Sequence, residues 1–224
     1  MQIIWKGQSC FQIISQTGKN NQVYLITDPF DETIGLRVPK LEADILLISH
    51  SHFDHNNKKA VSSPVPGQNP FIIEGPGEYE IKGVFILALP SFVSQNLGGQ
   101  GIHKINTIYV IETEEMRLCH LGMLQQKELS DEQLEKIGDI DILMIPVGGI
   151  YTIDSKGAAK VISQIEPKIV IPMHYHLPKL KEKLEGIDKF LKAMGAKSIE
   201  PQNKLSIKKK DLPEEGTKIV ILRP

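Results

Sequence analysis

Residues 49–56 read Ser-His-Ser-His-Phe-Asp-His-Asn, which places three histidines and one aspartate close together in the chain. The preceding run, Asp-Ile-Leu-Leu-Ile at residues 44–48, is short, branched and apolar, as is typical of a buried strand. His50 and His52 lie two residues apart, so in extended backbone their side chains leave the same face. Asp54 and His55 fall where we expect the chain to turn into a helix, so they approach the same point from a second direction.

Imidazole nitrogens and a carboxylate oxygen are ligands that zinc, iron and manganese accept. A lone histidine is usually an ordinary surface or core residue. Four chelating residues in the register His-x-His-x-Asp-His rarely occur together by chance. The stretch therefore predicts a metal site that uses His50, His52, Asp54 and His55.

The same stretch resembles the signature of the metallo-β-lactamase superfamily, which is His-x-His-x-Asp-His after a buried strand. Three further motifs extend the resemblance: Thr-Asp-Pro-Phe at residues 27–30, His-Leu-Gly at 120–122 and Ile-Pro-Met-His-Tyr at 171–175. Their order and spacing are similar to those of the small predicted zinc-dependent hydrolases, relatives of the ascorbate-phosphate lactonases. The resemblance implies an α/β protein, a four-layer αββα sandwich, with one domain over residues 1–224.

The resemblance also implies a set of metal ligands. In relatives with two metal ions, the first ion is held by the residues that correspond to His50 and His52, together with a third histidine from a middle loop. The second ion is held by the counterparts of Asp54, His55 and His174, and an aspartate bridges the two ions.

This chain departs from that pattern at three positions. Val93 stands where the third histidine is expected, Met123 stands where the bridging aspartate is expected, and Gln8 replaces a common supporting histidine. A thioether is a soft, neutral ligand and cannot replace a bridging carboxylate. We therefore expect at most one tightly bound divalent ion, zinc or else manganese or iron, on the side of Asp54 and His174.

Two classes of function remain open from the sequence. As an enzyme, the protein would use a metal ion to polarise an ester, lactone or phosphoester and to lower the pKa of water toward about 7. Asp54 would be the catalytic residue, as a ligand or as the group that orients the water. Alternatively, the fold is a catalytically inactive binding or scaffold module, as Met123 and Val93 suggest.

Three other histidines have open roles. His103 lies near the loop where a ligand is missing, so a shifted loop would bring it into the first site. The resemblance implies that His120 supports the bridging position rather than binds metal. His176 follows His174 by two residues, which favours a place at the rim of the site.

Composition narrows the expected partners and location. The chain has 224 residues, 41% of them hydrophobic, which is enough for one full core. A formal net charge of −1 gives no reason to expect nucleic acid or an anionic membrane as a partner. No apolar run approaches the ~20 residues that span a bilayer, and residues 1–6 lead directly into a strand rather than a signal peptide. We expect a cytoplasmic protein with free thiols at Cys10 and Cys119 and a small-molecule substrate that the sequence does not identify.

The pattern of elements changes along the chain. Short strands are predicted first, then a hairpin, and then helices that alternate with strands. The early strands are expected at residues 3–5, 11–14, 23–27, 44–49, 71–73 and 84–89, with a helix start at 56–60 and a turn at 74–78. The hairpin is expected at residues 107–111 and 116–121. Helices are expected from Ser130, from Asp154 and over 187–194, strands at 141–146, 168–172 and 218–222, and a solvated helix surface at 179–183.

Overall fold

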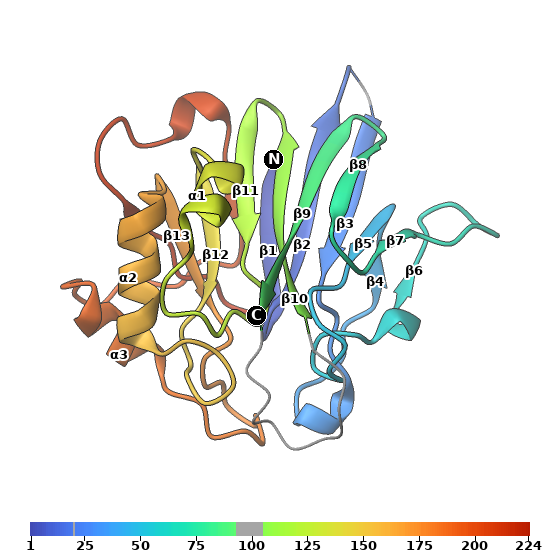
Figure 1. The fold of residues 1–224 in the computed structure, drawn as a ribbon. Coiled ribbons are helices and arrows are strands. Elements are labelled where there is room, and N and C mark those ends of the chain that lie inside the picture. Colours follow the sequence, from blue (N-terminus) through green and yellow to red (C-terminus); the bar gives the residue numbers. More distant parts are fainter. Residues whose placement is uncertain (20, 93–104) are drawn as a thin grey trace.

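Two large β-sheets face each other in the computed structural model, which describes residues 1–19, 21–92 and 105–224 (Figure 1). Val93, Ser94 and His103 lie outside the described residues. The first sheet has six strands in the order β14-β1-β2-β3-β5-β7. These strands are β1 (Gln2–Gly7), β2 (Cys10–Thr17), β3 (Asn21–Thr27), β5 (Ile45–Leu47), β7 (Phe71–Ile73) and β14 (Leu205–Ser206).

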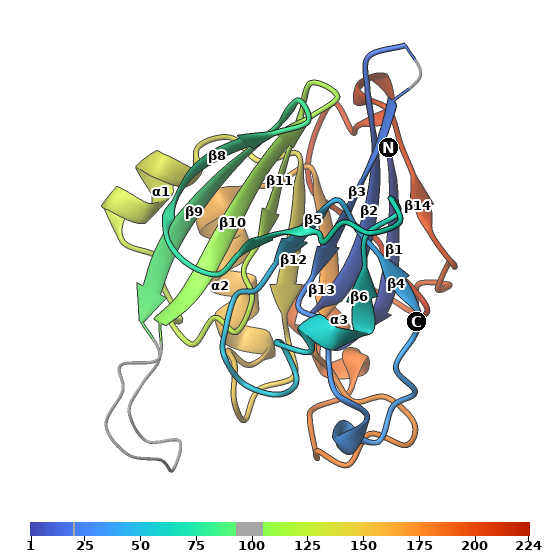
Figure 2. The same cartoon turned by 90° about the vertical axis from the view of Figure 1, so that its right-hand side faces the viewer.

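The second sheet has seven strands in the order β15-β13-β12-β11-β10-β9-β8. Its strands are β8 (Gly77–Ile81), β9 (Val84–Phe92), β10 (Ile105–Thr113), β11 (Met116–His120), β12 (Ile142–Pro146), β13 (Ile169–Met173) and β15 (Lys218–Ile219). A separate pair joins β4 (Leu41–Glu42) to β6 (Val61–Ser62). Within each large sheet, antiparallel pairing at one side gives way to parallel pairing at the other. Figure 2 shows the two sheets from the side.

The helices lie on the side of β12 and β13 in Figure 1. They are α1 (Asp131–Ile137), α2 (Ser155–Ile165) and α3 (Ile187–Ala193), and short 3-10 turns occur at η1 (Glu32–Ile34), η2 (Lys58–Ala60) and η3 (Lys209–Asp211). Ser130 begins α1 with a reciprocal capping box to Gln133, and the Asp154 carboxylate accepts a hydrogen bond from Gly157 N at the start of α2. Both predicted helix starts are confirmed.

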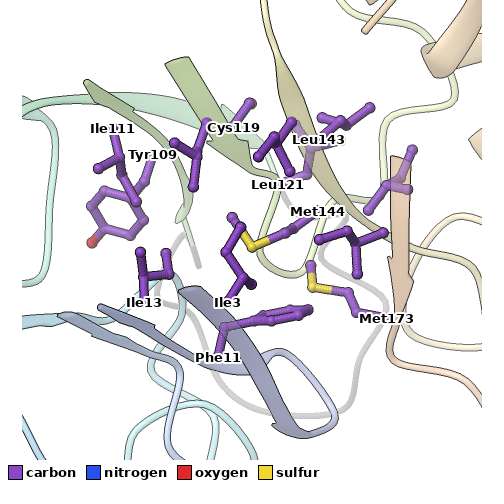
Figure 3. Packing of buried hydrophobic residues seen from close by; sticks show 14 of the residues in the cluster. Ile3, Phe11, Ile13, Tyr109, Ile111, Cys119, Leu121, Leu143, Met144 and Met173 are labelled. Carbon is purple, nitrogen blue, oxygen red and sulfur yellow. The ribbon is translucent and has the colours of Figure 1, made fainter. Parts of the chain in front are cut away.

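The core lies between the two sheets (Figure 3). Ile3, Phe11 and Ile13 on β1 and β2 face residues such as Tyr109, Leu121 and Met144 from the opposite sheet. Every residue of β12 and β13 is buried, as expected for central parallel strands that read as continuous apolar runs. The mixed α/β class with two facing sheets agrees with the prediction from sequence.

Two local predictions are wrong. Residues 74–78 do not form only a turn, because β8 begins at Gly77 and pairs with β9. Residues 179–183 contain no helix. In both cases contacts with distant segments determine the conformation, and local composition does not report such contacts. The short helix expected to start within residues 56–60 is the 3-10 helix Lys58–Ala60. Within the described residues, no helix is both long enough and apolar enough to cross a membrane.

Candidate metal centre

Asp54, His55 and His174 bring three potential ligand atoms to one point. Asp54 Oδ2 lies 3.5 Å from His55 Nε2 and 3.4 Å from His174 Nε2, and the potential ligand atoms of the three residues lie within 4.8 Å of one another. Ligand atoms around a tetrahedral zinc ion, with bonds of about 2.1 Å, lie about 3.4 Å apart. Asp54 and His174 are 120 positions apart in the chain, yet together with His55 they fit one zinc-sized cation.

Burial makes this arrangement costly without a cation. All three side chains are buried, and among the described residues His55 Nε2 has no hydrogen-bond partner. A buried polar atom that lacks a partner has lost its water without compensation. A divalent cation at this point would satisfy the free nitrogen and the neighbouring carboxylate together, so the donor set fits a metal ion.

Asp28 orients His55 from the other side of the ring. Asp28 Oδ2 lies 2.9 Å from His55 Nδ1 and accepts a hydrogen bond from Ser49 Oγ at 2.6 Å, while Oδ1 accepts one from Ser49 N at 2.7 Å. The arrangement assigns the Nδ1 proton of His55 to this contact and directs Nε2 toward Asp54. Such carboxylate–histidine pairs fix ring orientation in metal sites.

The charges at this point favour a cation. Burial alone would lower the pKa of His55, but the carboxylates of Asp54 and Asp28 raise it to about 9. Burial would likewise raise the pKa of Asp54, yet His55 and hydrogen bonds from His174 and His52 hold it well below its ordinary value. The two carboxylates therefore favour the protonated, positively charged form of His55 between them. A metal ion would supply that positive charge in place of the proton.

His52 and His50 lie beside the group of three. His52 Nδ1 is 2.5 Å from Asp54 Oδ1, and its half-exposed ring packs on Phe53 with ring centroids 4.2 Å apart. His50 is buried, with its ring centroid 6.3 Å from that of His55 and its Nδ1 3.4 Å from Ile105 O. The structure thus assembles three of the five residues predicted as ligands and places the other two next to them.

A strained backbone presents His174 directly after β13. Its φ is +51°, in the left-handed region that non-glycine residues rarely adopt, and its N–H donates to Gln8 O at 3.2 Å. Gly148 packs against it so closely that a Cβ at position 148 would lie 2.1 Å from His174 O. Gln8 and Asp28 also have positive φ, at 49° and 40°. Strain of this kind tends to gather at functional sites.

His120 and His176 both lie outside the group of three possible ligands. His120 Nε2 donates to Ser9 O at 2.9 Å and Nδ1 accepts from Gly122 N at 3.2 Å, so both ring nitrogens are already used. His120 therefore supports the turn before Met123 and offers no free ligand atom. His176 is exposed and lies outside the group of three.

Met123 is buried, and its N–H donates to Asn106 Oδ1 at 2.7 Å. Gln8 is fully buried, and within the described residues neither polar atom of its side-chain amide has a hydrogen-bond partner. Two of the three substituted positions thus hold uncharged, buried side chains, while the third, Val93, is outside the described residues.

Sequence reasoning missed the partial burial of Glu182, whose pKa is raised by burial and by the negative charge of Asp54. The lysine-rich run around it indicated only a solvated surface. The available signal was the spacing of Leu177, Leu180 and Leu184, which are all buried and enclose the residue in a packed segment.

The chain is similar to known proteins in both sequence and structure. Residues 2–174 match the family model described as the β-lactamase superfamily domain. The UPF0173 metal-dependent hydrolase of Thermoplasma volcanium is 30% identical over 200 residues, which cover 79% of this chain and 84% of that protein. A crystal structure from Thermotoga maritima, named as an inferred Zn-dependent hydrolase of the metallo-β-lactamase superfamily, is 34% identical. It superposes with a TM-score of 0.75 and covers 99% of this chain and 97% of its own.

A protein from Veillonella parvula shares the fold at a TM-score of 0.64 with 12% identity, covering 92% of this chain and 99% of that one. The narrower likeness to ascorbate-phosphate lactonases stays a prediction. The family model, the relative and the superposition agree with the motif in the sequence and with the fold. This chain belongs to the metallo-β-lactamase superfamily and is related to its UPF0173 metal-dependent hydrolases.

Proposed function

We propose that this protein is a metal-dependent hydrolase that holds one divalent cation, zinc in the first instance, between Asp54, His55 and His174. The observation that carries the proposal is that two buried histidine nitrogens lie 3.4–3.5 Å from Asp54 Oδ2, and one of them has no hydrogen-bond partner among the described residues. Manganese or iron would suit the same nitrogen and oxygen donors. The names of the relatives point in the same direction.

The residues of the site have distinct proposed roles. Asp54, His55 and His174 hold the ion, and Asp28 keeps His55 in the orientation that leaves Nε2 free. His52, through its contact with Asp54 Oδ1, keeps Oδ2 directed toward the two ligand histidines. When bound, the ion supplies Lewis acidity for an ester, lactone or phosphoester and a water of lowered pKa. Asp54 would serve as a ligand of the ion or as the group that orients that water.

His50 and His52 are the remaining predicted ligands, and we propose that they offer only a weak second position. Two protein ligands are fewer than the three that catalytic zinc sites usually provide. Met123 cannot bridge two cations, because its sulfur is neutral and soft. The protein should therefore bind no more than one ion tightly.

The second candidate is a binding or scaffold module without catalysis. The observation that favours it is the uncharged, buried Met123 where relatives with two ions have a carboxylate. The two candidates differ in turnover rather than in fold. In either case, we propose a single domain over residues 1–224, a small-molecule rather than nucleic-acid partner, in line with the net charge of −1, and a cytoplasmic location.

The test combines metal content with hydrolysis. The purified protein is loaded with zinc, desalted and measured by elemental analysis, then assayed with a lactone, a phosphodiester and a thioester. The parent and His176→Ala, which alters an exposed histidine outside the site, should retain about one zinc and hydrolyse one of these classes. His55→Ala should lose both properties. Retained zinc without turnover on any ester class would favour the scaffold, and a parent that binds no zinc would refute the metal site.

A further inference from the structure

Three large apolar side chains are exposed close to residues of the proposed metal centre. They are Phe53, Phe92 and Ile105, whose exposed fractions are 47%, 75% and 45%. Single apolar side chains are ordinary on a protein surface, but a group of them next to a reactive site provides a surface for a ligand. We call these three residues the apolar rim.

Phe53 is in direct contact with the residues around the proposed ion. Its ring packs on the ring of His52 with centroids 4.2 Å apart, and His52 Nδ1 lies 2.5 Å from Asp54 Oδ1. The carbonyl oxygen of Phe53 accepts a hydrogen bond from Asp31 N at 3.1 Å, which holds the backbone at this point. Phe53 therefore presents an open aromatic surface one residue before a proposed metal ligand.

Ile105 approaches the same stretch of chain from the second sheet. It begins β10, and its carbonyl oxygen lies 3.4 Å from His50 Nδ1. Two residues further on, Thr107 N donates a hydrogen bond to Ser49 O at 2.8 Å. The start of β10 therefore lies directly against the stretch that carries His50.

The pleat of β10 sets the direction of the Ile105 side chain. Alternate residues of a strand leave the same face, so Ile105 and Tyr109 share one. The Tyr109 hydroxyl donates to Ile48 O at 2.7 Å, so this face is turned toward the first sheet. Phe92 on β9 is the direct partner of Ile105, and directly paired side chains lie on one face of a sheet. Phe92 and Ile105 thus form one apolar wall that faces the chain after β5.

The apolar rim indicates the kind of substrate that the metal centre would accept. Its side chains carry no charge and no hydrogen-bonding group, so they recognise apolar surface. A metal-dependent hydrolase places the carbonyl to be cleaved at the ion, so the group attached to that carbonyl extends over the neighbouring side chains. We propose that the apolar rim binds the acyl chain of an ester or thioester whose carbonyl lies at the metal ion. This inference rests on the proposed function and names its substrate class.

Binding of the products of hydrolysis tests the inference without turnover. Straight-chain carboxylates from acetate to decanoate are titrated into the cobalt-loaded protein, and the visible spectrum of the cobalt reports the carboxylate at the ion. Affinity should rise by about two- to fourfold for each added methylene, because each methylene that leaves water favours binding. Decanoate should therefore bind about 100-fold more tightly than acetate, or more.

The main variant is Phe92→Ser, which changes an exposed side chain outside the group of possible ligands. It should bind cobalt and acetate as the parent does but bind decanoate about 5–20-fold more weakly, because part of the buried apolar surface is lost. Phe53→Ser should weaken decanoate more than acetate in the same way. The matched control is Phe71→Ser. Phe71 is 49% exposed and pairs with Ile45, at the opposite end of β5 from His50, so decanoate should bind this variant as it binds the parent.

The possible outcomes separate this inference from the proposed function. If cobalt binds but acetate and decanoate bind equally tightly, the metal site stands and the role of the apolar rim is refuted. If Phe71→Ser loses as much affinity for decanoate as Phe92→Ser does, the acyl chain binds elsewhere and the inference is also wrong. If the parent binds no cobalt, the proposed metal site fails, and the inference fails with it.

A second copy of the chain is the alternative occupant of the apolar rim. Sedimentation velocity of the parent and of Phe92→Ser tests this alternative. We expect the two proteins to have the same oligomeric state. A parent dimer that becomes a monomer in Phe92→Ser would assign these side chains to an interface between copies and overturn the inference.

Discussion

Asp28 is a residue that shapes the site without belonging to the group of three. It is fully buried and accepts from both the backbone and the hydroxyl of Ser49 as well as contacting His55 Nδ1. Burial would raise its pKa, but the charge and hydrogen bond of His55 hold it below its ordinary value. Asp28 therefore remains a carboxylate whose orientation determines which nitrogen of His55 faces Asp54.

Asp28→Asn should weaken zinc binding by about 10–100-fold, because an amide cannot accept all three hydrogen bonds and so loosens His55. The same change should lower the free energy of unfolding by about 1–3 kcal/mol, as expected when buried partners are left unsatisfied. Chelator competition and urea unfolding measure the two effects. Asp31→Asn, at the N-cap of η1, is the control and should change zinc affinity little. Equal affinities in all three proteins would contradict the orienting role.

Gly148 is the second residue on which the site depends, because its backbone lies against the carbonyl of His174. In Gly148→Ala the added methyl would lie 2.1 Å from that oxygen and would displace either the loop or the ligand. Overpacking of this kind typically costs about 1–3 kcal/mol. We expect lower Tm and weaker zinc binding, measured by thermal unfolding and by titration.

Gly186→Ala is a suitable comparison, since no heavy atom lies within 4 Å of a Cβ placed there. It should bind zinc as the parent does. If Gly148→Ala had the same Tm and zinc affinity as Gly186→Ala, the close contact with His174 would contribute neither to stability nor to metal binding.

At the scale of elements, residues of the site follow strands of both sheets. Asp28 follows β3, the stretch from Ser49 comes after β5, and His174 comes directly after β13. The two sheets must therefore keep their relative position for the ligands to meet. On the side of His174, the parallel strands β11, β12 and β13 maintain this relative position. Asp141 lies directly before β12, near the start of these strands.

Asp141 links three segments through its carboxylate. It accepts from Arg117 N at 2.9 Å and from Lys209 Nζ at 2.9 Å, and Lys168 Nζ lies 3.3 Å away. Burial would raise its pKa, but these donors lower it below the ordinary value of 3.8. A carboxylate with a lowered pKa stabilises the fold above its unfolded pKa, and that contribution is lost as pH falls through the folded value.

Asp141→Asn should therefore lower the free energy of unfolding by about 1.5–3 kcal/mol at pH 7, the usual range for hydrogen bonds to a charged group. The difference from the parent should shrink as the pH falls below about 4, because the parent's carboxyl is then protonated as well. Urea unfolding at several pH values measures it, with exposed Asp139→Asn as control. A difference that stays constant from pH 7 to pH 3 would show that charge is not involved.

At the scale of the whole molecule, local sequence signals predicted the elements whose determinants are local. The buried strands β5, β12 and β13 are continuous apolar runs, and the helix starts at Ser130 and Asp154 have their caps in the adjacent sequence. The hairpin of β10 and β11 was also predicted where it occurs. These features depend on neighbours within a few residues.

Features set by distant contacts were not predictable in this way. β8 alternates glutamates with half-buried residues and forms only because β9 pairs with it. β14 pairs with β1 from the opposite end of the chain. Glu182 reads as part of a solvated charge run, yet in the fold burial and the negative charge of Asp54 raise its pKa. The motif identifies the types of residue that could bind a metal ion. The packing of the fold determines their arrangement, with His174 close to Asp54 and His55. His50 and His52 lie beside this group.

We propose that one divalent ion binds between Asp54, His55 and His174. Anomalous diffraction at the zinc absorption edge, from crystals grown with zinc, would locate that ion. We predict a single strong peak about 2.1 Å from Asp54 Oδ2, His55 Nε2 and His174 Nε2. A peak held instead by His50 and His52, two peaks of equal height, or no peak in this group of residues would contradict the claim.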